Sequence, residues 1–138
     1  MGVRVGGIEF YAGPTVLGGP DDLDAVIREF IAGARHTLRV AVQELDSRPI
    51  AQAILAARAA GVRVQIILEG DYLREDRPAA DPWSAAGANE ENRLIYAALL
   101  RAGVDLITDL NPGIFHRDSS CGTAASPLRG CSPGPRIL

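Results

Sequence analysis

The sequence predicts an α/β fold, specifically a layered α-β-α sandwich around a mixed, mostly parallel sheet. Segments with helical spacing of apolar residues alternate with short segments rich in valine and isoleucine. Two junctions are also alike: residues 56–67 (AARAAGVRVQII) and 98–108 (ALLRAGVDLIT) both run from a helix through an Ala-Gly stop into a strand that begins with valine. Repeated helix-to-strand units are typical of α/β layers.

The first unit is a helix in residues 18–35 followed by a strand in residues 37–45. Turn residues and an aspartate cap precede the helix, and its apolar stripe comprises Leu23, Val26, Ile27, Phe30 and Ile31. The strand alternates, with one face made of Leu38, Val40 and Val42.

The second unit is a helix in residues 46–61 and a strand in residues 62–70. Asp46 or Ser47 can cap the helix, Pro49 is harmless in its first turn, and Gly61 can supply a left-handed stop. Its narrow apolar stripe comprises Ile50, Ile54 and Leu55. The strand ends in a continuous apolar run, which is expected where helices cover both faces of a sheet.

The third unit follows a charged, proline-rich segment, residues 71–88, which we expect to be a long surface loop. Residues 89–103 predict a helix that Asn89 can cap, with Glu90 and Glu91 in its first turn. Its apolar face comprises Leu94, Ile95, Ala98 and Leu99. Residues 104–110 predict the next strand.

Composition limits the classes of function. The chain has 138 residues, 47% of them hydrophobic, which suits one globular domain, and its formal net charge of -3 supplies no basic field for a polyanion. No apolar run reaches signal-peptide or membrane-spanning length. The two cysteines, Cys121 and Cys131, both lie in the final segment, so we expect a cytoplasmic protein without structural disulfides.

The order of segments between Val16 and His116 resembles the first half of a phospholipase D superfamily domain. The resemblance rests on four segments, taken in chain order: LRVAVQEL, AAGVRVQIIL, RAGVDLITD and NPGIFH. In that family the last loop leads into His-x-Lys, with an Asp five residues after the Lys. The resemblance implies a phosphodiesterase whose histidine attacks phosphorus, forms a phosphohistidine and needs no metal or other cofactor. In that family two such motifs come together to form one active site. The implied partner of this chain is therefore a second subunit of a homodimer or a missing second half-domain.

By this resemblance His116 is the catalytic nucleophile. Asp118, however, stands in the place of the motif lysine and Thr123 in the place of its aspartate, and the chain contains no lysine at all. A carboxylate where an anionic phosphate must bind predicts an inactive form. The irregular segment after His116 further predicts that the domain is truncated. The substrate, a phospholipid or a nucleic acid, stays open. A non-catalytic structural or interaction remnant, or a small-ligand-binding α/β domain, are the alternatives.

We expect two parts in the chain: a half-domain core in residues 1–115, and an irregular, disordered or frameshifted tail in residues 116–138. The tail has no apolar periodicity and no strand to complete the sheet, which we expect to be incomplete at its C-terminal end. If the codons of residues 117–123 are back-translated and then read one base out of register, the shifted reading allows an Asp at the spacing from His116 that the family motif has. The shifted reading does not restore the motif lysine. We hypothesise a frameshift there.

The remaining candidate residues can also be explained by ordinary structural roles. An acidic cluster, which could serve a ligand at the strand ends, comprises Glu44, Asp46, Glu69 and Asp71, and we favour solvated loop acids and helix caps. His36 follows a helix end, where a capping cation is usual. Trp83, in the long loop, could contact a substrate or cover the core.

Overall fold

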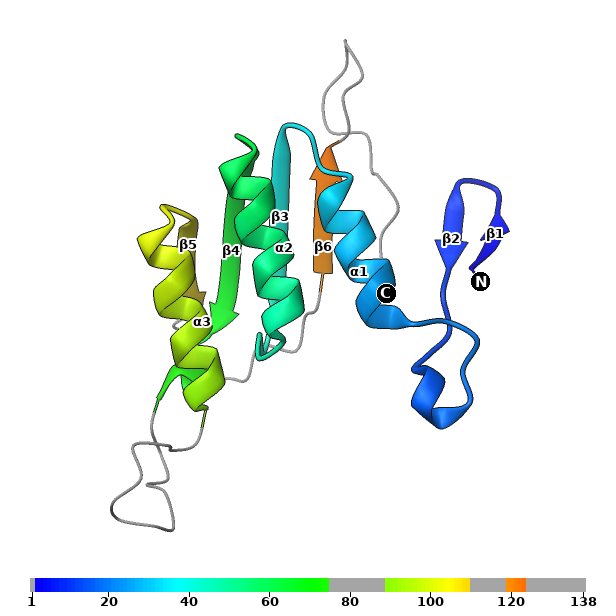
Figure 1. Cartoon of the computed structure of the whole chain (residues 1–138), viewed down its shortest axis with the longest axis horizontal. Coiled ribbons are helices and arrows are strands. Elements are labelled where there is room, and N and C mark those ends of the chain that lie inside the picture. The colour runs from blue at the N-terminus through cyan, green and yellow to red at the C-terminus, as the bar shows by residue number, and fades with distance from the viewer. Residues whose placement is uncertain (1, 75–88, 110–118, 124–138) are drawn as a thin grey trace.

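The computed structural model describes residues 2–74, 89–109 and 119–123. Its main sheet has four strands in the order β5-β4-β3-β6 (Figure 1). Three of them are parallel, namely β3 (Thr37–Val42), β4 (Arg63–Glu69) and β5 (Asp105–Asp109). The last, β6 (Ser119–Thr123), runs antiparallel to β3. The predicted α/β class and the mixed, mostly parallel sheet are therefore confirmed.

Strand β6 corrects one expectation, since no strand was predicted after His116. Its backbone pairs with β3 from Ser119 opposite Ala41 to Thr123 opposite Thr37. The sequence of β6, SSCGT, has little strand propensity, but the hydrogen-bonding edge of β3 pairs with any backbone whatever its side chains. The boundary proposed between residues 115 and 116 stays a prediction.

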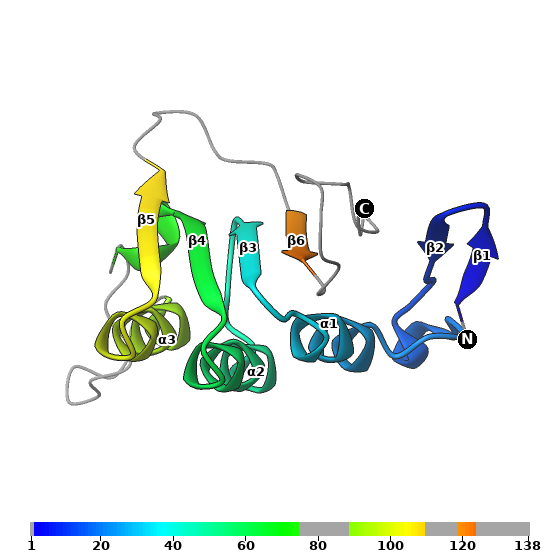
Figure 2. The same cartoon turned by 90° about the horizontal axis from the view of Figure 1, so that it is seen from above.

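Three helices lie side by side on one face of the sheet (Figure 2). They are α1 (Leu23–Ala32), α2 (Arg48–Ala59) and α3 (Glu90–Arg101), as the apolar spacing predicts. In β4 the residues on the helix side are buried, whereas Gln65 and Ile67 on the other side are half-buried. The described residues thus form two layers, and the second helical layer of the predicted sandwich is not found among them.

The hydrophobic core lies between these helices and the sheet. Its most deeply buried side chains are Leu38, Ile54, Val64, Ile66 and Leu99. The predicted apolar face of α3 is only partly right, because Ile95 and Leu99 are buried but Leu94 is 49% exposed. Asn92, three residues before Ile95, occupies the buried stripe in its place.

Two of these three helices begin at the side-chain cap that the sequence predicts. The Asp22 side chain caps α1 by accepting from the backbone N–H of Ala25, and Ser47 caps α2. The predicted cap of α3 is wrong: Asn89 has a left-handed backbone, and its side chain instead donates to the carbonyl of Arg74. Gly61 adopts the predicted left-handed conformation after α2.

Four short elements were not predicted. A hairpin of β1 (Val3–Val5) and β2 (Ile8–Phe10) precedes a single 3₁₀ turn, η1 (Thr15–Leu17), and a second such turn, η2 (Gly70–Leu73), follows β4. The hairpin and η1 lie beyond α1, away from the sheet (Figures 1 and 2). Among the helices of the described residues, none is long and apolar enough to cross a membrane.

Candidate functional site

The candidate site is the edge of the sheet where the parallel strands end, which we call the carboxyl edge. Glu69, the last residue of β4, lies opposite Asp109, the last residue of β5. Ser119, the first residue of β6, lies opposite Ala41 near the end of β3. Helices α2 and α3 begin beside this edge, because each follows a parallel strand. Open α/β sheets bind their ligands at such an edge.

Asn92 ties the chain after β3 to the first turn of α3. Its Oδ1 accepts a hydrogen bond of 2.8 Å from the backbone N–H of Leu45, and its Nδ2 donates to Glu44 Oε1 at 3.1 Å. The Asn92 side chain is nearly inaccessible, with 4% of its surface exposed, and Leu45 is also buried. The amide therefore satisfies a buried backbone donor while it fixes the position of the loop at the carboxyl edge.

Sequence reasoning missed Asn92, although a signal was present. The residue stands three and seven positions before Ile95 and Leu99, which places it on the buried stripe of α3. A polar side chain at such a position needs a buried hydrogen-bond partner, and the partner proves to be a loop 47 residues earlier in the chain.

The four acids of the predicted cluster do not converge on one point of contact. Glu69 is 2% exposed, and its Oε1 accepts from the backbone N–H of Asp71 at 3.3 Å, which caps η2. Asp71 pairs with Arg74 at 3.2 Å, and Asp46 is exposed. With Glu44 bound to Asn92, these contacts are those of caps and surface acids. In the described parts of the chain, no three His, Cys, Asp or Glu side chains gather to hold a metal ion.

Polar contacts also join the other elements at this edge. Gln43 Nε2 donates to the Tyr72 hydroxyl at 3.0 Å, which links the end of β3 to η2. Arg48 binds Glu91 through two hydrogen bonds and so links the starts of α2 and α3. The hydrogen bond from Arg48 lowers the pKa of Glu91, against a smaller opposing effect of desolvation.

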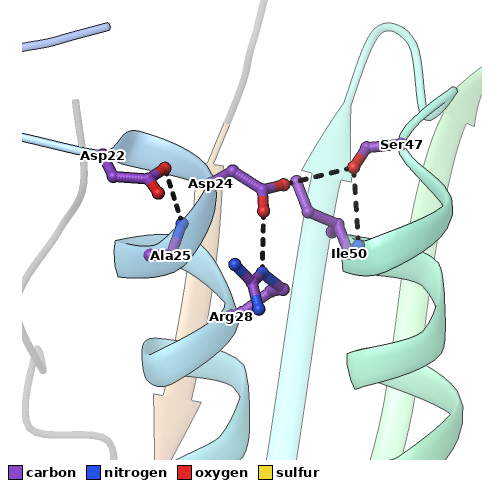
Figure 3. A network of polar contacts seen from close by, with 6 residues as sticks. All are labelled: Asp22, Asp24, Ala25, Arg28, Ser47 and Ile50. Atoms are coloured by element: carbon purple, nitrogen blue, oxygen red, sulfur yellow. Dashed lines mark hydrogen bonds and ion pairs between the residues drawn. The ribbon is translucent and has the colours of Figure 1, made fainter. Parts of the chain in front are cut away.

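The starts of α1 and α2 are connected in the same way, as Figure 3 shows. The Ser47 hydroxyl donates to Asp24 Oδ1 at 3.3 Å and accepts from the backbone N–H of Ile50. The other oxygen of Asp24 accepts from Arg28 at 2.7 Å, one turn along α1. Side-chain contacts thus connect α1 to α2 and α2 to α3 where the helices begin.

The predicted nucleophile, His116, lies outside the described residues, as do Asp118 and Trp83. Thr123, at the position of the motif aspartate, lies opposite Thr37 at the other end of β3. His36 also lies at that far end, where its carbonyl accepts from the backbone N–H of Arg63.

The cation expected at the end of α1 comes from a neighbouring residue. Arg35, not His36, reaches back to this helix and donates to the carbonyl of Ala32 at 3.3 Å. His36 is exposed and precedes β3 directly. The structure therefore gives His36 no contact with the carboxyl edge.

The sequence and the fold were compared with known proteins. The profile of the family described as "Cardiolipin synthase, PLD-like domain" matches residues 27–119. No curated protein sequence matched the chain. Among solved structures, the phospholipase D family member Nuc from Salmonella typhimurium is similar, with a TM-score of 0.55 and 19% identity, over 71% of this chain and 55% of Nuc.

Polyphosphate kinase from Porphyromonas gingivalis is also similar, with a TM-score of 0.50 and 16% identity, over 78% of this chain and 16% of the kinase. At these identities the structural likenesses concern the fold alone, and this chain spans about half the length of Nuc. The profile match extends over most of the chain, including every strand and helix from β3 to β5. The chain therefore belongs to the family of phospholipase D-like domains.

Proposed function

We propose that this chain is a phospholipase D-like half-domain that carries the position of the histidine nucleophile but does not turn over phosphodiesters with its present residues. The observation that carries the proposal is the family match over residues 27–119, a range that contains His116. The resemblance of the segment order to the family supports His116 as the motif histidine. In an intact site this imidazole would attack the phosphorus of a phosphodiester, and a second histidine from another half-domain would protonate the leaving alcohol.

Chain connectivity supports a nucleophile near the carboxyl edge. His116 precedes Ser119 by three residues, and Ser119 pairs with Ala41 at that edge. Three residues of extended chain span at most about 10 Å. A histidine at this position is thus within reach of the edge where Glu69 and Asp109 end their strands.

Charge supports the absence of turnover. Phosphodiester attack builds negative charge on the phosphoryl oxygens, which the family lysine neutralises, and here Asp118 would add a negative charge in its place. Two arginines beside the edge are already paired, Arg48 with Glu91 and Arg74 with Asp71. An anionic substrate is therefore opposed rather than attracted.

The test is hydrolysis of bis(p-nitrophenyl) phosphate by the purified chain and by a variant in which the motif lysine is restored, Asp118→Lys. We expect no rate above that of His116→Ala for the chain as it stands. The restored variant should form an acid-labile phosphohistidine that His116→Ala removes. His36→Ala is the matched control, because it removes the other histidine, at the far end of β3. Hydrolysis by the unmodified chain that His116→Ala abolishes would contradict the proposal.

The gene offers a separate check of the frameshift hypothesis. If residues after His116 are read out of frame, the shifted frame downstream should encode the remainder of a phospholipase D-like domain. A shifted frame without such a sequence would refute that hypothesis and leave the departures at Asp118 and Thr123 as native features.

A further inference from the structure

One face of the main sheet is covered by none of the described helices. All three helices lie on the other side (Figure 2). On the open face Arg39, Asp105 and Ile107 are exposed, the last with 58% of its surface, and Gln65 and Ile67 are half-buried. Sheets of parallel strands are almost always covered on both faces, so this face is expected to receive a cover.

One row of residues across the open face has a charge at each end. In the strand register Gln65 of β4 lies between Arg39 of β3 and Asp105 of β5. Its Oε1 accepts from Arg39 Nε at 3.1 Å, and its Nε2 donates to Asp105 Oδ2 at 2.9 Å. The amide therefore orients a cation and an anion on strands about 10 Å apart, which is two strand spacings. A guanidinium has five N–H donors, so Arg39 retains donors for a second carboxylate.

The next row toward the carboxyl edge is apolar and uneven in size. Ala41 of β3, Ile67 of β4 and Ile107 of β5 are neighbours in the strand register. The small side chain, Ala41, is at one end of the row, and the large exposed one, Ile107, is at the other. Each of the two rows thus complements its own reverse order, by charge in the first row and by size in the second.

We propose that a second copy of this chain covers the open face. A two-fold axis that lies between the copies, parallel to the strands and above β4, places β3 of each copy over β5 of the other. Arg39 then faces the partner's Asp105, and Ile107 fills the space above the partner's Ala41. A two-fold axis perpendicular to the strands at Gln65 would instead set Arg39 against the partner's Arg39. Of these two arrangements, the parallel axis pairs opposite charges and therefore defines how the copies dock.

This interface is independent of the proposed phosphodiester chemistry, because it involves neither His116 nor the carboxyl edge. Its absence would therefore leave the proposed function in place. The interface is three parallel strands wide, so we expect a dimer dissociation constant in the micromolar range rather than a permanent dimer.

Sedimentation equilibrium of the full chain measures the dimer. Arg39→Asp sets carboxylate against carboxylate across the interface, and Asp105→Arg sets guanidinium against guanidinium. Because the two-fold axis changes two contacts at once, each variant should raise the dimer dissociation constant by about a hundredfold or more. Arg101→Asp is the matched control, since it reverses an exposed arginine at the end of α3, and it should dimerise like the parent. Circular dichroism verifies that all variants fold.

Mixing the two variants distinguishes this contact from other effects of the substitutions. A heterodimer of Arg39→Asp with Asp105→Arg again has opposite charges at both contacts, so an equimolar mixture should regain the affinity of the parent. Loss of the hydrogen bonds to Gln65 within each chain is not repaired by mixing. The proposal would be overturned by a parent that stays monomeric at millimolar concentration, by single variants that dimerise like the parent, or by a mixture that stays monomeric.

Discussion

Asn92→Ala tests whether one buried amide holds the loop of the candidate site in place. The substitution removes the acceptor of the buried Leu45 N–H, and a buried donor without a partner costs about 1–3 kcal/mol. Loss of the bond to Glu44 adds about 0.5–1 kcal/mol, since that carboxylate is exposed. Alanine recovers about 0.5 kcal/mol of helix propensity. The net loss should be about 2 kcal/mol in the free energy of unfolding.

The assay is urea unfolding followed by circular dichroism, with Leu94→Ala as the control. Leu94 lies two residues away on the same helix and is 49% exposed, so its replacement should change stability by less than about 1 kcal/mol. Asn92→Asp separates the two hydrogen bonds, because it keeps an acceptor for Leu45 but sets a buried carboxylate against Glu44.

The aspartate variant should depend on pH in a defined direction. Burial and the neighbouring Glu44 would raise the pKa of the introduced carboxyl group above its unfolded value, so the destabilisation should appear as pH rises through the unfolded pKa and diminish in acid. The reasoning would be refuted if Asn92→Ala unfolded at the same urea concentration as the parent. That result would mean that the Leu45 N–H is solvated without Asn92.

Two other predictions follow from contacts in the described residues. Arg48 lowers the pKa of Glu91, so this pair contributes stability at neutral pH that is lost as pH falls through the lowered pKa. Arg48→Ala should therefore raise the pKa of Glu91 in an NMR titration of its carboxyl group. If that pKa did not move, Arg48 would not be the cause of the lowered value. Gly13→Ala should speed hydrogen exchange of the Ala12 backbone N–H, which donates to Asp21 Oδ2, because the added Cβ would clash with the Asp21 carbonyl. Gly7→Ala is the control and should leave this exchange unchanged, because a Cβ there has open space. Equal exchange rates in the two variants would show that the loop between Ala12 and Asp21 adjusts to the added Cβ.

Local signals were sufficient to predict most of the secondary structure. Apolar spacing predicted the three helices, and Asp22 and Ser47 cap α1 and α2 as their positions before the apolar stripes suggest. These features depend on neighbours within one or two turns, so the chain encodes them locally. The order of segments also predicted the phospholipase D-like fold, which the family match confirms.

The tertiary structure decided what depends on residues far apart in the sequence. Asn89 was predicted to cap α3 but donates to the carbonyl of Arg74. Asn92, which sequence reasoning missed, lies in the third unit of the fold and accepts from the backbone N–H of Leu45 in the first. Strand β6 forms against β3 despite a sequence with little strand propensity. Periodicity and capping rules act over a few residues, whereas backbone pairing and burial are set by which segments meet in space. The sequence by itself therefore determined the helices, the parallel strands and the family, and only the folded chain decided how the carboxyl edge is held together.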